Sequence, residues 1–205
     1  KKFISYLAAF NFKSGDGFRP NSGFNSRNYF FQMNFKLSDK TKIKTEFTLL
    51  DYLAQQAGGL SDKMFNENPF QSNRSRNWFN IDWLLFQTLI KHSFSDNSKL
   101  DIQLFGLNAQ RDALGYRTNR VSAVDPNSYR DLISGKFKNY GIETKWLKEF
   151  RFLTKKLIFL LGGKWYSAEN TSNQGPGSAG SNPDFKFYNQ ENPYYSYQSN
   201  YRYPN

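Results

Sequence analysis

The sequence predicts an all-β fold, namely a fragment of a transmembrane antiparallel up-and-down β-barrel. Three observations support this prediction. Apolar and polar residues alternate along most of the chain, which is the period of a strand with two different faces. The expected strands have about 12 residues or more, whereas strands of globular proteins usually have about 5 to 6. Short and long connections alternate, as they do between the two ends of an outer-membrane barrel.

We expect about seven strands. The first runs from about Lys2 to Lys13. The second strand and the third form a hairpin, in which Ser38-Asp39-Lys40 makes the turn and the third strand continues through Leu49. The apolar positions of the second strand occur at every other residue: Tyr29, Phe31, Met33, Phe35 and Leu37.

Two further hairpins complete the predicted set. One joins a strand from about Asn77 to Phe94 to a strand from Lys99 to Arg111 through the turn residues 95–98. The last joins Tyr140–Trp146 to Leu157–Trp165 through a link near Glu149 to Thr154.

The remaining connections are long. They are 14–24, about 54–76, about 112–139 and everything after about Glu169. In outer-membrane barrels the periplasmic connections are tight turns and the extracellular ones are long loops, so the alternation predicts sidedness as well as fold. Aromatic residues near the expected strand ends are typical of interfacial girdles: Phe3, Tyr29, Trp78, Phe79, Tyr140 and Trp165.

Composition excludes several other classes. Aromatic residues make up 19% of the 205 residues, which excludes disorder despite a mean hydropathy of -0.75. The longest apolar run, Leu157–Leu161, is far below the roughly 18 residues of a membrane-spanning helix. A soluble β-sandwich also alternates polar and apolar residues and stays open as an alternative, although the long strands argue against it.

Charge and cysteine content give weaker constraints. The net charge of +11 suits nucleic acid, an anionic membrane surface or an anionic ligand, but the 28 Lys and Arg residues are dispersed, which disfavours nucleic acid. With no cysteine there is no disulfide, thiolate metal site or cysteine nucleophile. Lys1 begins no signal peptide, so we expect the natural N-terminus to lie elsewhere.

Three stretches, with the hairpins between them, cover nearly all of the chain: QQAGGLSDKMFNENPFQSNRSRNWF (55–79), FGLNAQRDALGYR (105–117) and GPGSAGSNPDFKF (175–187). They resemble loops and strands of ferric-citrate-type TonB-dependent receptors. The first is the most specific, and Ala57 departs from it because the family often has proline there. Its matching residues are Gly58, Gly59, Leu60, Asp62, Phe65, Pro69, Arg74, Arg76, Asn77, Trp78 and Phe79.

The resemblance implies a multi-pass barrel of about 22 strands in the bacterial outer membrane. Residues 1–205 would be part of that single barrel domain, with the plug domain and the remaining strands outside this chain. It further implies a non-enzymatic transporter that imports a ferric chelate, is energised by TonB through the plug, and contacts lipopolysaccharide. Neither the plug nor a TonB-contacting segment is visible in these residues.

Arginines of the long loops are the candidate ligand-binding residues. An anionic chelate must be taken from water, and the planar guanidinium forms bidentate, charge-assisted hydrogen bonds with carboxylates. Solvated loop charges, or contacts with lipopolysaccharide phosphates, are the alternative for each residue. The candidates are Arg74, Arg76, Arg111, Arg117, Arg120 and Tyr116, with Tyr188, Tyr194 and Tyr195 as further residues that could line a vestibule.

Other motifs predict no chemistry. Gly15, Gly17 and the GPGSAG glycines precede neither a Lys-Ser/Thr pair nor a helix, so they are turn glycines and not a phosphate loop. His92 is the single histidine and lies beside a short turn, which disfavours catalysis. We expect no cofactor and no protein metal site, because iron would arrive inside its chelator.

Two alternatives to ferric-chelate import stay open. The same barrel could carry another cargo, such as another siderophore, a cobalamin-like complex or an oligosaccharide. It could also be a structural or surface-interaction component of the outer membrane. The density of loop arginines is the sequence feature that separates an anionic cargo from a neutral one.

Overall fold

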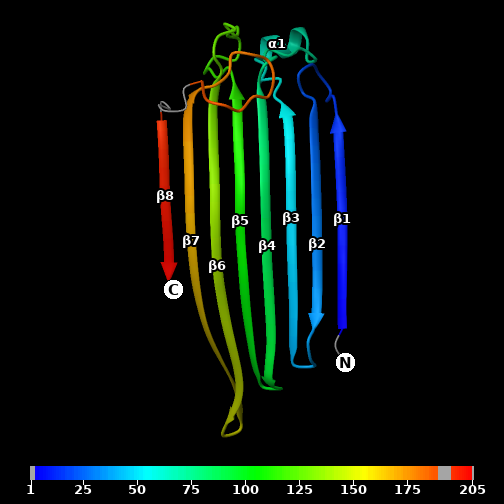
Figure 1. Ribbon diagram of the computed structural model, residues 1–205, viewed down its shortest axis with the longest axis vertical. Coiled ribbons are helices and arrows are strands. Elements are labelled where there is room, and N and C mark those ends of the chain that lie inside the picture. The colour runs from blue at the N-terminus through cyan, green and yellow to red at the C-terminus, as the bar shows by residue number, and fades with distance from the viewer. Residues whose placement is uncertain (1–2, 189–194, 205) are drawn as a thin grey trace.

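The computed structural model describes residues 3–188 and 195–204, the last range by its backbone. Eight strands follow one another along the chain (Figure 1). They are β1 (Phe3–Gly15), β2 (Phe24–Lys36), β3 (Thr41–Gln55), β4 (Trp78–Ser95), β5 (Ser98–Gly115), β6 (Asp131–Phe152), β7 (Lys155–Pro176) and β8 (Tyr195–Pro204). In the described ranges the helical element is α1 (Asp62–Glu67), and no helix there is long and apolar enough to cross a membrane.

All strands belong to one antiparallel sheet in the order β1 to β8, each paired with its neighbours in sequence. This confirms the predicted up-and-down architecture. The predicted number of strands was too low, because β8 lies in the segment that the sequence assigned to the last long connection. The tyrosines of YSYQSNYRYP, at 195, 197, 201 and 203, are spaced as on one face of a strand.

The hairpin of β6 and β7 is longer than the sequence predicted. Its strands pair over 22 positions each, from Asp131 opposite Pro176 to Phe152 opposite Lys155. The expected link from Glu149 to Thr154 is therefore a tight turn at Leu153 and Thr154. Leu153 adopts a left-handed backbone conformation with a φ of 57°, which non-glycine residues rarely adopt, so residue types gave no turn signal there.

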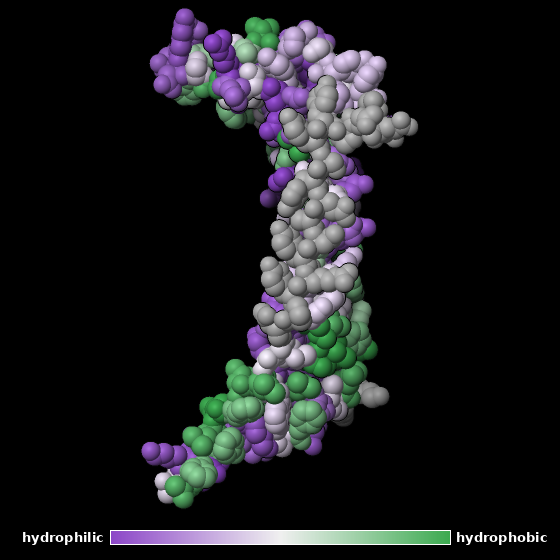
Figure 2. Space-filling view, turned by 90° about the vertical axis from the view of Figure 1, so that its left-hand side faces the viewer, coloured by the Kyte–Doolittle hydropathy of each residue, from purple (hydrophilic) through white to green (hydrophobic). Residues whose placement is uncertain are grey.

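The sheet has two different faces. On the apolar face, cross-strand neighbours such as Phe31 and Phe47, or Ile43 and Ile90, lie side by side. On the mixed face the same strands carry polar neighbours such as Gln32, Glu46 and Gln87. Large side chains of the apolar face are exposed in this chain, and hydrophobic residues gather in its lower part (Figure 2). Examples are Tyr6 (75%), Phe10 (59%), Leu49 (47%) and Trp165 (45%).

The loop-side border of the apolar face slopes across the sheet. On β1 the last apolar residue before the loop is Phe12 and the first polar one is Ser14, whereas on β7 they are Trp165 and Ser167. When the paired residues are followed from strand to strand, Ser167 on β7 leads to Ala8 on β1. Ala8 lies six residues from Ser14 along β1. Six residues are about 20 Å along a strand and six strand spacings about 29 Å, so the border is inclined by about 35°. Strands of transmembrane barrels tilt by about 35–45°.

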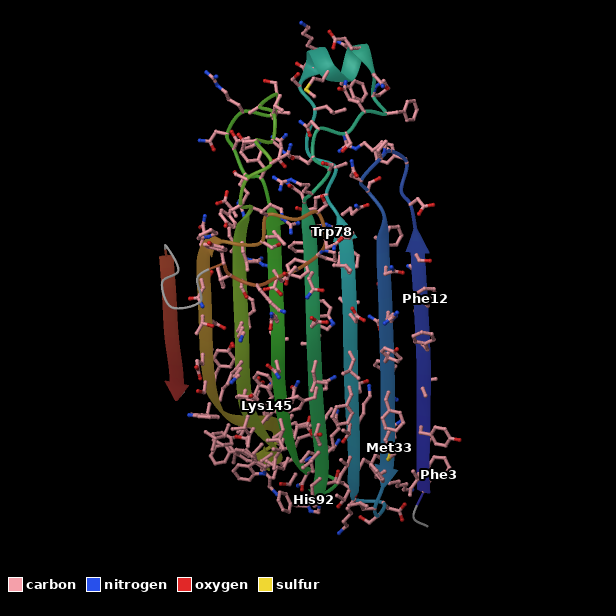
Figure 3. The ribbon with its side chains drawn as sticks, turned by 45° about the horizontal axis from the view of Figure 1, so that its top comes forward. Phe3, Phe12, Met33, Trp78, His92 and Lys145 are labelled. Carbon is pink, nitrogen blue, oxygen red and sulfur yellow. The ribbon has the colours of Figure 1, made fainter. Side chains whose placement is uncertain are left out.

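The expected girdle residues divide between the faces. Tyr29, Tyr140 and Trp165 lie near the loop-side border of the apolar face. Phe3 and Phe79 lie on the mixed face, opposite Lys36 and Ala54, so they cannot belong to an outward girdle. Trp78 lies at the loop end of β4, where its indole donates to Ser181 O at 2.7 Å (Figure 3).

Candidate functional site

The long connections meet at one end of the sheet (Figure 1). We number them as the first loop (16–23), the second loop (56–77), the third loop (116–130) and the fourth loop, which is described from 177 to 188. Opposite them lie three short turns, at 37–40, 96–97 and 153–154. Five of the six predicted ligand-binding residues belong to the second or third loop, and one of them, Tyr116, begins the third.

Gly58 closes the second loop on itself. Its φ of 78° is left-handed, and a Cβ there would lie 2.2 Å from Asn73 Oδ1 and 2.6 Å from Arg74 Cγ. The two ends of the loop are joined by a hydrogen bond from Asn73 N to Ala57 O at 3.3 Å. Arg19 of the first loop donates to Gly58 O and to Gln71 O, the latter at 3.3 Å. The second loop is therefore packed internally and hydrogen-bonded to the first loop.

The side chain of Arg76 joins the second loop to the third and fourth. Its guanidinium forms a bidentate pair with Asp125, and the Nε contact measures 2.9 Å. Its Nη1 donates to Ser128 O at 3.1 Å and to Ala179 O at 2.6 Å. Burial raises the pKa of Asp125, but hydrogen bonds from Arg76 and from the Asn127 N–H outweigh burial, so the pKa lies below its ordinary value. The guanidinium of Arg76 thus bonds to groups of the third and fourth loops.

Arg130 forms a second connection that sequence reasoning missed. Its side chain is 1% exposed and donates to Arg76 O at 2.8 Å, Ser178 O at 3.0 Å and Asn182 O at 2.8 Å. Burial lowers the pKa of this guanidinium. No local pattern distinguishes Arg130 from the exposed arginines of the same loop, because its carbonyl partners are 48 or more residues away in sequence.

Arg74 connects the second and third loops in a third way. It is 6% exposed, and its Nη1 donates to Asn73 O at 2.6 Å and to Ala123 O at 3.0 Å. The guanidinium carbon lies 5.1 Å from the centre of the Tyr116 ring, which is within cation–π range. One side of the Tyr116 ring is therefore covered by a charge that is held in place.

A polar hollow of about 420 Å³ lies between the second and third loops. It brings together three of the predicted site residues, Arg74, Tyr116 and Arg117. Arg117 is exposed, and its charge opposes the effect of burial, which raises the pKa of Asp131. The rest of the lining is mostly polar or glycine: Gly58, Gly59, Asn73, Asn77, Thr118, Asn119, Val121, Asp131 and Gln174. Such a site can hold a polar, anionic ligand through hydrogen bonds.

The other predicted residues lie outside this hollow. Arg111 is exposed on the mixed face of β5, opposite Ile81 and Gly135, and Arg120 is exposed in the third loop. Tyr188 pairs with Tyr129 at 4.2 Å between ring centres. Tyr194 lies outside the described residues, and Tyr195 begins β8.

His92 has a structural environment at the turn end (Figure 3). Its Nδ1 lies 2.9 Å from Thr41 Oγ1, and its ring meets Phe94 edge-on at 4.7 Å. Among the residues that the structure describes, no group of His, Asp and Glu side chains could hold a metal ion.

Comparison with known proteins gives structural likeness alone. No protein-family model matches the sequence, and no curated protein matches it significantly. The ferric citrate transporter FecA, in its unliganded form, aligns with a TM-score of 0.74 at 14% identity over 86% of this chain and 25% of its own. BauA, the ferric preacinetobactin receptor from Acinetobacter baumannii, aligns with a TM-score of 0.63 at 7% identity over 91% of this chain and 34% of its own.

At these identities the likeness shows the fold. The sheet corresponds to a barrel segment of such receptors, and this chain spans a quarter to a third of the length of the two proteins.

Proposed function

We propose that this chain is part of the barrel wall of a TonB-dependent outer-membrane transporter that imports a ferric chelate, ferric citrate or a similar siderophore. The observation that carries the proposal is the exposed apolar face, whose sloping border matches the tilt of strands in transmembrane barrels. The Arg- and Tyr-containing hollow at the loop end supports the choice of cargo.

The apolar face requires a non-aqueous partner. Removing one large apolar side chain from water is favourable by about 1.5–3 kcal/mol, and every one of β1 to β7 presents several. Among the described residues the buried apolar side chains are small or lie at the loop end, so the sheet does not cover this face itself: Ala54, Ala57, Leu114, Leu132 and Ala168. Lipid of the outer membrane meets the requirement, with the long loops outside the cell and the short turns in the periplasm.

The mixed face would then point into the barrel. It has a hollow of about 420 Å³ that Phe30, Glu46, Gln87, Phe105 and Tyr166 help to line. A surface with both apolar and hydrogen-bonding groups suits contact with a folded domain more than an open water channel. We therefore propose that the plug domain implied by the family resemblance packs here, and that TonB acts through the plug.

Ligand capture is assigned to the hollow between the second and third loops. Arg117 provides an exposed guanidinium, and Tyr116 provides a hydroxyl and a ring whose position Arg74 fixes. Arg111 lies on the mixed face, which would point into the barrel. Arg120 lies in the third loop, outside the hollow. Arg76 would act indirectly, by holding the loops that form the walls.

The test is binding of ferric citrate and related anionic chelates to the full-length receptor in detergent. Arg117→Ala should weaken binding by roughly 10- to 150-fold, the loss expected for one charge-assisted contact. Arg120→Ala removes an equal charge from the same loop but outside the hollow, and it should change binding little. If both variants bind every anionic chelate as well as the parent, the hollow is not the site, and a neutral cargo or a surface-interaction role becomes the better explanation.

A further inference from the structure

The β6–β7 hairpin extends beyond the other turns of the sheet (Figure 1). Its last connections to β5 are the pairing of Ser98 with Lys148 and the hydrogen bond from Glu149 N to Asn97 O at 2.8 Å. On β6, Phe150, Arg151 and Phe152 therefore have no neighbour on the β5 side. At the tip, Phe152 is 64% exposed and Leu153 is 88% exposed.

The slope of the apolar face explains why this hairpin is long. The turn-side border begins at Ile4 on β1, whose hydrogen-bonded row reaches β7 at Gly163. Leu157, the last apolar residue of that face on β7, lies six residues farther toward the turn. The turn-side border is therefore displaced by six residues between β1 and β7, as the loop-side border is. With strands tilted by about 35°, the perpendicular distance between the two borders is about 22 Å. The tip at 151–156 lies just past the border, which in the proposed membrane placement is the level of lipid headgroups.

The tip combines apolar and basic side chains. Arg151, Lys155 and Lys156 lie within six residues, and the single nearby acid, Glu149, pairs with Lys156 at 2.5 Å. The other turns lack this combination. The first turn is also basic, with Lys36, Lys40 and Lys42, but Asp39 pairs with Lys36 at 2.5 Å, and Leu37 is its one exposed large apolar side chain. The second turn consists of Asp96 and Asn97.

We propose that the tip of the β6–β7 hairpin is a binding site for anionic phospholipid headgroups of the periplasmic leaflet. This inference rests on the proposed membrane placement. Phe152 and Leu153 enter the boundary between headgroups and acyl chains, while Arg151 and Lys155 contact the headgroup phosphates. Basic side chains at a membrane surface attract acidic lipids by an amount equivalent to roughly 5-fold per charge.

The absence of native cysteine makes a site-specific test simple. A fluorophore is attached to Leu153→Cys in the full-length receptor, which is reconstituted in nanodiscs of equal parts phosphatidylcholine and phosphatidylglycerol. Either lipid is brominated in turn, because bromine quenches a fluorophore within contact range. Quenching at the tip should be several-fold stronger when phosphatidylglycerol carries the bromine. A label at Leu104→Cys, in the middle of the apolar face, should be quenched equally by both lipids.

Charge removal provides the second arm. The triple variant Arg151→Gln/Lys155→Gln/Lys156→Gln should lose the preference for phosphatidylglycerol. The matched variant Lys36→Gln/Lys40→Gln/Lys42→Gln, at the first turn, should keep it. Quenching of the Leu104 label without any lipid preference at the tip would overturn this inference and leave the membrane placement intact. An unquenched Leu104 label would overturn both.

Discussion

Arg76 and Asp125 form a bidentate ion pair between the second and third loops, with side chains that are 6% and 11% exposed. Removing one partner of a buried pair leaves the other charge without compensation, at a cost of about 3–5 kcal/mol. Asp125→Ala should therefore lower the free energy of local opening of both loops by about that amount, measured by hydrogen exchange of the backbone amides. Asp51→Ala is the control, because it breaks the exposed pair with Arg27 and should cost less than about 1 kcal/mol. Equal protection in the two variants would mean that the buried pair does not hold the loops.

The same pair predicts how loop order depends on pH. The pKa of Asp125 in the folded loops lies below its ordinary value of 3.8, so its contribution to loop stability is fully present above that value. The contribution is lost as the pH falls from 3.8 through the lowered folded pKa. Protease resistance of the third loop should stay constant from neutral pH down to near 3.8 and then decrease. Asp125→Asn should remove this component of the decrease, and an unchanged profile in that variant would assign it to other carboxylates.

Gly58 and Gly59 offer adjacent substitutions with opposite expectations. Alanine at position 58 must adopt a φ of 78° and meets Asn73 and Arg74, whereas nothing lies within 4 Å of a Cβ at position 59. Left-handed backbone costs a non-glycine residue about 1–2 kcal/mol before any collision is counted. Gly58→Ala should therefore increase hydrogen exchange in the second loop, whereas Gly59→Ala should leave it unchanged. Identical behaviour of the two variants would show that the tight closure at Gly58 is not required.

Alternation of apolar and polar residues was sufficient to predict the architecture, because each strand has one face that must avoid water. Strand ends were less predictable. The turn at Leu153 and Thr154 has no glycine, asparagine or proline, and pairing with the partner strand keeps Lys148–Phe152 extended. Between Asp131 and Tyr140, β6 has few apolar side chains on the apolar face of the sheet. The sequence therefore did not predict that the strand begins at Asp131.

The arginines of the loops illustrate a different limit. Their chemistry was evident, but their partners were not, because Asp125, Ser128 and Ala179 meet Arg76 across 49 to 103 residues of sequence. Arg74 and Arg76 are buried and Arg117 is exposed, although all three lie in polar, loop-like sequence. Which arginines are free to meet a ligand depends on loop packing, and periodicity carries no information about it.

The last prediction concerns the side of the membrane that each end of the sheet faces. Single cysteines at Gly59 and Gly180, where an added Cβ has open space, should react with an impermeant thiol reagent in intact cells. These positions are preferable to Ser61, which caps α1, and to Ser178, which accepts a hydrogen bond from Arg130. Cysteines at Asp39, Asn97 and Leu153 should react only after the outer membrane is permeabilised, because the short turns face the periplasm in the proposed orientation. Reaction of the three turn positions in intact cells, with protection at Gly59 and Gly180, would invert the orientation and remove the proposed hollow from the extracellular side.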